Sequence, residues 1–169
     1  MNIYALSSGR GPSGIAIVRI SGKDTLKICK TLTKLKGINS NEVNYCKFYD
    51  PKNDKIIDPE ALLLLFPGPN SYTGEDLAEF QVHGSNAVIN ALLKALSEQD
   101  NCRLAEPGEF TKIAFQNDKI DLLKAESIGD LIHAETELQR DQAVKLVQGN
   151  ASNYYNDLRE KLIKSLSYI

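Results

Sequence analysis

The stretch FPGPNSYTGEDLAEFQVHGS, from Phe66 to Ser85, decides how the rest of the chain can fold. It begins where an apolar run meets two prolines and a glycine, which predicts the end of a buried strand and the start of an irregular loop. From Leu77 to Val82 apolar and polar residues alternate, as in a half-buried strand. Glu79 would lie on the face opposite Phe80, so the pattern predicts a carboxylate mounted on a strand beside a large loop.

Upstream of this stretch, β-branched and apolar runs predict a set of strands joined by turns and one helix. Ser21 offers an N-cap for an amphipathic helix over Asp24 to Leu35, which Gly37 ends. The turn residues between Asp50 and Asp54 separate two further runs. The expected strands are Ile3–Leu6, Ile15–Ile20, Val43–Tyr49, and Ile56–Ile57 continued by Ala61–Phe66.

The loop between the first two strands contains a G-x-G-x-x-G sequence, Gly9 to Gly14. This pattern binds a dinucleotide only if a helix N-terminus comes next in the chain to receive the pyrophosphate. The next residues instead form the β-branched run Ile15–Ile20, which predicts a strand. A P-loop is excluded too, because Ile15 and Ala16 stand where Lys and Ser or Thr are required. A loop connecting two strands is therefore favoured over either phosphate site.

Downstream of the central stretch, the pattern changes from mixed to helical. A helix is expected over Asn86–Leu96, a last strand over Cys102–Ala105 and a short helix over Thr111–Phe115. From Leu122 the pattern is helical to the end, with an interruption at Gly149-Asn150. This change predicts two domains, residues 1–117 and 118–169. The second should be incomplete, because its amphipathic helices need missing sequence or another copy to bury their apolar face.

Composition limits the class of protein. The 169 residues are 42% hydrophobic and 25% charged, which suits one soluble globular core with an appendage. The net charge is −2 and neither half of the chain has an excess of basic residues, so the basic stripe of an autonomous nucleic-acid binder is not expected. The three cysteines have no C-x-x-C spacing, so reduced, cytoplasmic surroundings are expected without a zinc site or disulfide framework. No apolar run approaches bilayer length, and the start is interpreted as the mature N-terminus.

Several charged residues have a structural and a functional interpretation. Arg19 interrupts an apolar strand, so it either faces solvent or is committed to a partner, and the residues alone favour solvent. His83 stands at a strand end beside a glycine, where a structural role is favoured, and His133 is expected to be exposed or interfacial. Helix capping is favoured over acid/base catalysis for the acids in loops and at helix starts, Glu75, Asp76, Glu106 and Glu109.

Four strings together resemble the N-terminal region of the MnmE (TrmE) family of tRNA modification GTPases. They are GRGPSGIAIVRISG, FPGPNSYTGEDLAEFQVHG, RLAEPGEFTKIAFQNDKIDLLKAESIGDLIHAETE and LVQG. The similarity runs from Leu6 to about Gly149 in the family's order and spacing. Two positions depart from the family. Ser85 replaces the second glycine of its H-G-G string, which puts the loop backbone near a ligand in doubt, and His133 replaces an aspartate, which should change local helix contacts only.

The resemblance implies an α+β fold. It consists of an N-terminal mixed β-sheet domain with flanking helices, similar to the tetrahydrofolate-binding domain of aminomethyltransferases, and then the long helices of an incomplete helical domain. In the family a Ras-like GTPase domain is inserted into the helical domain, and this chain stops before that insertion. The 169 residues contain neither G-x-x-x-x-G-K-[ST] nor the family's C-terminal cysteine motif. GTP, Mg²⁺ and K⁺ are therefore expected only in the full-length family, and this chain should not be catalytic alone.

The resemblance also implies a function. With an FAD-dependent partner of the MnmG (GidA) type, the family modifies C5 of the wobble uridine of certain tRNAs, using a folate one-carbon unit. The region similar to this chain homodimerises and binds 5-formyltetrahydrofolate. By motif position, its folate-contacting residues are Arg19, Glu79 and Lys119. A carboxylate suits the amino group and ring N–H of a pterin, and the two cations suit the anionic tail or the formyl-bearing edge.

The chain then has three functional interpretations. The first is a folate-binding, dimerising module of a tRNA-modifying GTPase. The second is a scaffold that dimerises and docks the FAD-dependent partner without a working folate site. The third, an independent one-carbon transferase, ranks last because no strong general base or nucleophile is present. The joint presence of Arg19, Glu79 and Lys119 favours the first over the second, since a structural role would not require all three.

Overall fold

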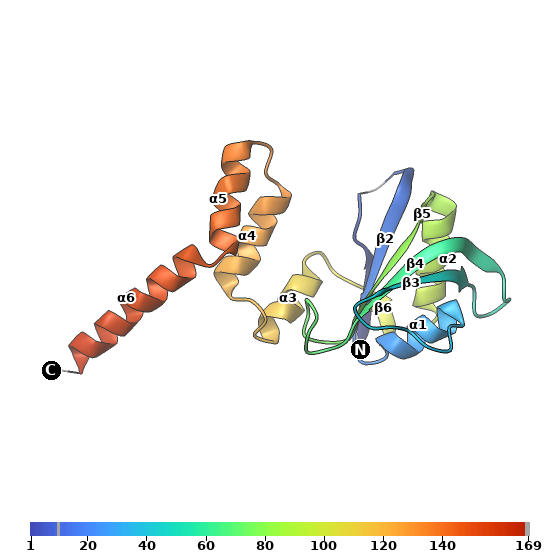
Figure 1. Cartoon of the computed structure of the whole chain (residues 1–169), viewed down its shortest axis with the longest axis horizontal. Coiled ribbons are helices and arrows are strands. Elements are labelled where there is room, and N and C mark those ends of the chain that lie inside the picture. The colour runs from blue at the N-terminus through green and yellow to red at the C-terminus, as the bar shows by residue number, and fades with distance from the viewer. Residues whose placement is uncertain (10, 168–169) are drawn as a thin grey trace. The chain divides into compact units, whose positions relative to one another are not determined.

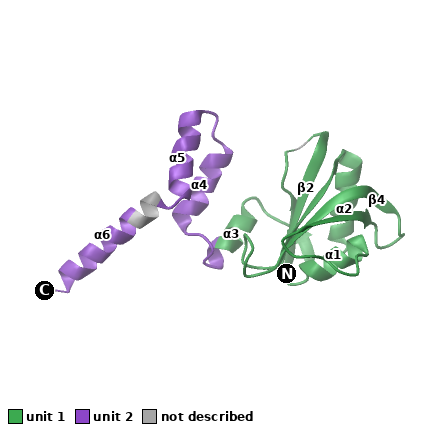
Figure 2. Ribbon diagram, viewed as in Figure 1, with its two compact units in different colours: residues 1–114 green, residues 115–169 purple. Residues whose placement is uncertain are grey.

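The computed structural model describes residues 1–9 and 11–167, which form two compact units, residues 1–114 and 115–169 (Figure 2). Arg10, in the glycine-rich loop, lies outside the described residues. The units divide within helix α3 (Glu109–Gln116), and the domain limits 1–117 and 118–169 stay a prediction. None of the helices in the described part of the chain is both long enough and apolar enough to cross a membrane.

The first unit is built on a mixed sheet (Figure 1). The sheet has six strands in the order β3-β4-β5-β2-β1-β6. Strands β1 and β6 pair in parallel, whereas the other neighbours pair antiparallel. The strands are β1 (Asn2–Leu6), β2 (Ser13–Ser21), β3 (Val43–Tyr49), β4 (Ile56–Phe66), β5 (Leu77–Gly84) and β6 (Cys102–Leu104).

Helices α1 (Thr25–Thr33) and α2 (Asn86–Ser97) supply the helical side of one core. Leu32 and Leu92 from these helices and Phe80 from the central strand β5 are fully buried in that core. The Phe80 ring lies 5.0 Å from that of Phe48 on β3, measured between centroids. Burying such side chains is the main source of stability in a domain of this size. The core therefore holds the central strands in a fixed register.

That register sets the position of the candidate site. In the antiparallel pair of β2 and β5, Arg19 lies opposite Glu79, and Leu64 of β4 lies on the other side of Glu79. The neighbouring residues Val18 and Phe80 point into the core and are fully buried. A slip by one residue would turn Arg19 into the core and Val18 out of it, which the burial cost of a charged group opposes. The alternation predicted for β5 is thus confirmed.

The second unit is helical. It contains α4 (Leu122–Ile132), α5 (Glu137–Val147) and α6 (Asn150–Leu166), and α4 and α5 lie side by side (Figure 1). The expected interruption is confirmed at Gly149, which has a positive φ of 85°. A second break at residues 133–136 was not expected. There Thr136 begins α5 with a capping box, in which its hydroxyl accepts from the Gln139 N–H and the Gln139 side chain accepts from the Thr136 N–H.

The α+β class, a mixed sheet with flanking helices followed by further helices, is confirmed by this architecture. The expected helix cap at Ser21 is wrong. Ser21 does not cap α1: it belongs to β2, is fully buried, and its hydroxyl lies 2.7 Å from that of Thr73. Asp24 takes the N-cap position without a side-chain cap bond. The Ser21 hydroxyl instead forms a hydrogen bond with the loop before β5. Because Ser21 is only a few residues before α1 in the sequence, it resembled a helix cap.

Candidate functional site

Two of the three predicted site residues form an ion pair on the sheet face away from α1 and α2. Arg19 Nη2 lies 2.6 Å from Glu79 Oε1, and Arg19 Nε donates to the same oxygen at 3.1 Å. The side chains are 28% and 20% exposed, so the pair is partly shielded from water. The solvent-facing interpretation of Arg19 is therefore wrong. The sequence alone does not reveal which residue lies opposite Arg19 on the neighbouring strand, and that residue determines the environment of the guanidinium.

Two aromatic rings complete the surroundings of Arg19. Its Cζ atom lies 5.6 Å from the ring centroid of Tyr72 and 5.6 Å from that of Phe110. Both distances fall within the range of a cation–π contact. The Tyr72 hydroxyl lies 2.9 Å from the Thr111 hydroxyl, which connects the loop before β5 to the start of α3. The site thus combines a carboxylate, a guanidinium and two aromatic faces.

The loop that carries Tyr72 is held by backbone and side-chain bonds. Gly68 N–H donates to the Asp76 carboxylate at 2.9 Å, and the Asp76 carbonyl accepts from Gly22 N–H and from the Thr25 hydroxyl. A Cβ atom on Gly68 would lie 2.7 Å from the Gly74 carbonyl oxygen, so only glycine fits there. These contacts fix the loop next to the strand that bears Glu79. They also agree with a structural rather than a catalytic role for Asp76.

The third predicted residue, Lys119, belongs to the second unit. It is exposed in the turn that joins α3 to α4. Its approach to Arg19 and Glu79 therefore stays a prediction, and the structure brings together two of the three residues. Tyr72 and Phe110 were missed by the sequence interpretation, because a loop residue and a helix residue meet only through the fold. An aromatic residue inside the polar loop P-G-P-N-S-Y-T-G was a usable signal for Tyr72.

A cavity of about 610 Å³ lies in the first unit beside Phe110. Its volume is within the range of small-molecule sites. Within the described lining, Glu106 is the charged residue, and the remaining residues are apolar or neutral polar. The lining comes from the end of β1 with the loop after it, from one face of α2, and from the segment that runs from the end of β6 into α3: Ala5, Leu6, Ser7, Ser8, Gly11, Asn86, Ile89, Asn90, Leu93, Leu104, Ala105, Glu106, Pro107, Gly108 and Phe110.

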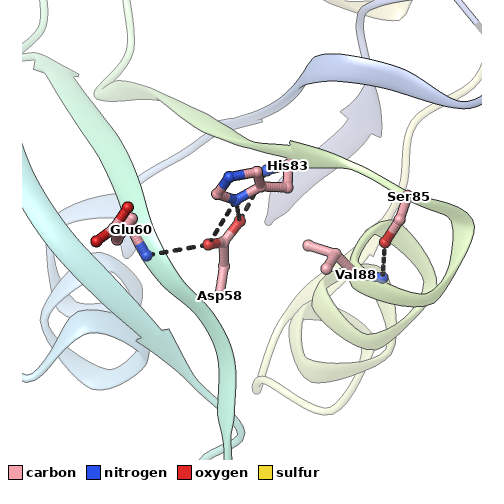
Figure 3. A network of polar contacts seen from close by, with 5 residues as sticks. All are labelled: Asp58, Glu60, His83, Ser85 and Val88. Carbon is pink, nitrogen blue, oxygen red and sulfur yellow. Dashed lines mark hydrogen bonds and ion pairs between the residues drawn. The ribbon is translucent and has the colours of Figure 1, made fainter.

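A second polar cluster lies farther along β5 (Figure 3). The fully buried Asp58 carboxylate accepts from the backbone N–H groups of His83 at 2.7 Å and Glu60 at 3.1 Å, and His83 Nδ1 lies 2.9 Å from its Oδ1. The regular pairing of β4 with β5 ends at Leu62 and Gln81, so Asp58 replaces strand partners beyond that point. These contacts agree with the structural interpretation of His83. Asp58 was missed, although an Asp-Pro pair inside an apolar strand run was a usable signal.

The remaining titratable groups do not form a second reactive centre among the described residues. Hydrogen bonds from Arg103 lower the pKa of the Glu109 carboxyl, which also accepts from Glu106 N–H at 2.8 Å. Glu109 therefore stays ionised and acts as a local cap. Burial raises the pKa of the Cys46 and Cys102 thiols to about 11, so both remain protonated at neutral pH and are poor nucleophiles.

Comparisons with known proteins place the chain in a family. The family described as GTP-binding protein TrmE N-terminus matches residues 2–119, and the MnmE helical domain matches residues 122–169. The chain is 57% identical over 169 residues to the tRNA modification GTPase MnmE of Pelagibacter ubique, covering 100% of this chain and 38% of that protein. It is 43% identical over 166 residues to the MnmE of Parvibaculum lavamentivorans, covering 98% of this chain and 38% of that protein.

A eukaryotic relative gives a similar result. The tRNA modification GTPase gtpbp3, mitochondrial, of Dictyostelium discoideum is 40% identical over 173 residues, covering 99% of this chain and 34% of that protein. The chain thus spans between 34% and 38% of the length of these curated relatives. The matches together cover both units of the structure. The chain therefore belongs to the MnmE (TrmE) family of tRNA modification GTPases, and it corresponds to their N-terminal part with the beginning of the helical domain.

Proposed function

We propose that this chain is the folate-binding and dimerising part of a tRNA modification GTPase, with 5-formyltetrahydrofolate as its ligand. The observation that carries the proposal is the Glu79 carboxylate, which is paired on a sheet face with Arg19, whose guanidinium also contacts the rings of Tyr72 and Phe110. A pterin has an amino group next to a ring N–H, and a carboxylate accepts this pair as two parallel charge-assisted bonds. Aromatic side chains offer surfaces on which such a ring stacks.

The anionic tail of the folate requires cations and space. Arg19 stands next to the proposed pterin position, and Lys119 is the second cation that we assign to the tail or to the formyl-bearing edge. Phe110, whose ring contacts Arg19, also lines the 610 Å³ cavity. The cavity takes part of its lining from α2, which covers the other face of the sheet, so it offers space next to Phe110 and not next to Glu79 itself.

Dimerisation is supported by the sheet face opposite α1 and α2. Strand register places Tyr45 next to Leu62 and Val43 next to Leu64 on this face. Val43 is 60% exposed, Tyr45 is 64% exposed, and Ile15 on β2 is 63% exposed. Apolar residues gathered on one open face mark an interaction surface. We propose that a second copy of the chain covers the part of this face that carries Tyr45 and Ile15, beside the residues that we assign to the folate.

The wider function is proposed from the family. We infer that the full-length protein acts in the cytoplasm with an FAD-dependent partner of the MnmG type on the C5 position of the tRNA wobble uridine. tRNA would be engaged through that complex. GTP, Mg²⁺ and K⁺ are assigned to other parts of the full-length protein, because G-x-x-x-x-G-K-[ST] does not occur in these 169 residues. Within that protein, this chain provides the folate-binding site and the dimer contact.

Calorimetric titration with 5-formyltetrahydrofolate tests the proposal. We expect one ligand per chain, and we expect Glu79→Gln to weaken binding roughly 10- to 100-fold, because the variant loses a charged acceptor. Glu98→Gln is the matched control. Glu98 is also paired with a cation, Lys52, and its side chain is 21% exposed, against 20% for Glu79. This control should bind like the wild type.

Two outcomes would contradict the proposal. If a folded sample that sediments as a dimer does not bind the folate, the scaffold interpretation replaces it. If Glu79→Gln binds as tightly as the wild type while the ligand still saturates, the pterin does not pair with this carboxylate. In that case the 610 Å³ cavity would be the next position to test.

A further inference from the structure

The hydrogen bonds of Glu79 are distributed unevenly over its two oxygens. Arg19 Nε and Nη2 both donate to Oε1, at 3.1 and 2.6 Å. Each carboxylate oxygen offers two lone pairs, so these two N–H groups saturate Oε1. A two-pronged pair with a pterin needs both oxygens. Glu79 therefore cannot form that pair while Arg19 keeps both of its bonds.

Arg19 also resembles the proposed ligand in shape and donors. A guanidinium is planar and presents parallel N–H groups to a carboxylate, as the amino group and ring N–H of a pterin do. Its Cζ atom lies 5.6 Å from the ring centroids of both Tyr72 and Phe110. The side chain thus occupies both features that a pterin would use, the carboxylate and the aromatic faces.

We propose that Arg19 is an internal competitor, which occupies Glu79 and the two rings in the free protein and releases them when a folate binds. This inference rests on the proposed function and deepens it, because it assigns control of access to one residue. The side chains of the pair are 28% and 20% exposed, so a ligand can reach it from the open sheet face and exchange one charge-assisted partner of Glu79 for another. The protein does not have to refold to open the site.

The released guanidinium has a new partner only if the ligand carries a tail. A folate brings carboxylates beside the site, and the flexible arginine stem lets the charge move to them. A pterin without a tail displaces Arg19 from Glu79 but has no carboxylate with which the guanidinium can form a new ion pair. Arg19 thereby makes the site selective for tailed folates over free pterins, by penalising one and contributing to the other. Arg19 should therefore weaken the binding of a tail-free pterin and strengthen the binding of a tailed folate.

The test compares two ligands, 5-formyltetrahydrofolate and the tail-free 6-methyltetrahydropterin, by calorimetry on the full chain. We expect Arg19→Ala to strengthen binding of the tail-free pterin by roughly three- to tenfold, the range for the net contribution of a hydrogen-bonded partner. The preference for the tailed folate should fall by at least about tenfold. Lys52→Ala is the control, because it removes a cation from another ion pair, with Glu98, and should change neither affinity.

Guanidinium ion gives a second readout. At millimolar concentration, below denaturing levels, it should compete with 6-methyltetrahydropterin in Arg19→Ala, because it refills the vacated position beside Glu79. It should not compete in the wild type, where Arg19 already fills that position. If Arg19→Ala does not fold, Arg19→Gln is the second variant, because it retains a planar group. It should shift each affinity in the direction expected for Arg19→Ala.

The outcomes separate this inference from the proposed function. Equal weakening of both ligands by Arg19→Ala would overturn it, because Arg19 would then contact the pterin directly. An unchanged affinity for the tail-free pterin would also overturn it, since no competition would exist. If the wild type binds neither ligand, the proposed function fails, and this inference fails with it.

Discussion

Asp58 shows how one buried side chain closes the end of a strand pair. Its carboxylate is fully buried and accepts from the backbone N–H groups of His83 and Glu60 (Figure 3). Asp58→Ala would leave both N–H groups without this acceptor. We expect it to lower the free energy of unfolding by about 2–4 kcal/mol, the cost of leaving buried donors unpaired. Urea denaturation followed by circular dichroism measures the change.

His83→Ala is the matched control for this prediction. It removes the ring contact to Asp58 but keeps the backbone N–H of residue 83 as a donor. Since the His83 side chain is 59% exposed, we expect a loss of about 1 kcal/mol or less. Equal losses in the two variants would show that the ring contact, and not the backbone bonds, is the important part.

At the residue scale, the sequence predicted on which face of a strand a side chain lies better than it predicted which residue that side chain contacts. Alternation along residues 77–82 was enough to place Glu79 on the face opposite the core. The partner of Arg19 depends on strand order and register, which alternation within one strand does not contain. The same reason explains why Tyr72 and Phe110 were missed. Their shared contact with Arg19 joins three segments that are far apart in the chain.

At the element scale, Ser85 offers a test of a departure from the family. It is the N-cap of α2, with φ −84° and ψ 144°, and its hydroxyl accepts from Val88 N–H at 3.2 Å. Any residue adopts this backbone conformation, so the serine replaces the glycine without straining the loop. We expect Ser85→Ala to lower the free energy of unfolding by about 1 kcal/mol, and Ser85→Gly by only a few tenths.

The measurement pairs urea denaturation with folate titration. Ser97→Ala is the control at the other end of α2, where the hydroxyl donates to the Lys94 carbonyl. Ser85→Gly should leave the affinity for 5-formyltetrahydrofolate within about twofold of the wild type, because the loop backbone does not need to move. A larger change would mean that residue 85 shapes the ligand site and does more than cap a helix.

The elements themselves were largely predictable, because each has a local signal. The strand Val43–Tyr49 has the predicted bounds, and Gly149 interrupts the terminal helices as expected. The break before α5 was missed, although Thr136 and Gln139 have the spacing of a capping box. The Ser21 cap failed for the opposite reason. A hydroxyl that suits a helix start also suits a buried contact, here with Thr73, and only the fold decides between them.

At the scale of the whole molecule, the two units differ in how much they bury. The hydrophobic core cluster lies entirely in the first unit, between Tyr4 and Leu96. In the second unit, the buried residues within the described chain are Ser127 and Ala143, whereas Ile132 and Leu138 are 74% and 80% exposed. Local stability depends on the burial of apolar contacts. The helices of the second unit should therefore unfold locally far more often than those of the first.

Hydrogen exchange followed by mass spectrometry measures this difference within one sample. Helices α2 and α5 are matched in length, with 12 and 11 residues, and each begins with a side-chain cap. We expect amides of α5 to exchange at least about 100-fold faster than those of α2, which corresponds to a gap of about 2.7 kcal/mol in opening free energy. Equal protection in a dilute sample would contradict the prediction. Protection of α5 that rises with protein concentration would instead mean that a second copy covers these helices, and the dimer contact would then extend beyond the sheet face that carries Tyr45.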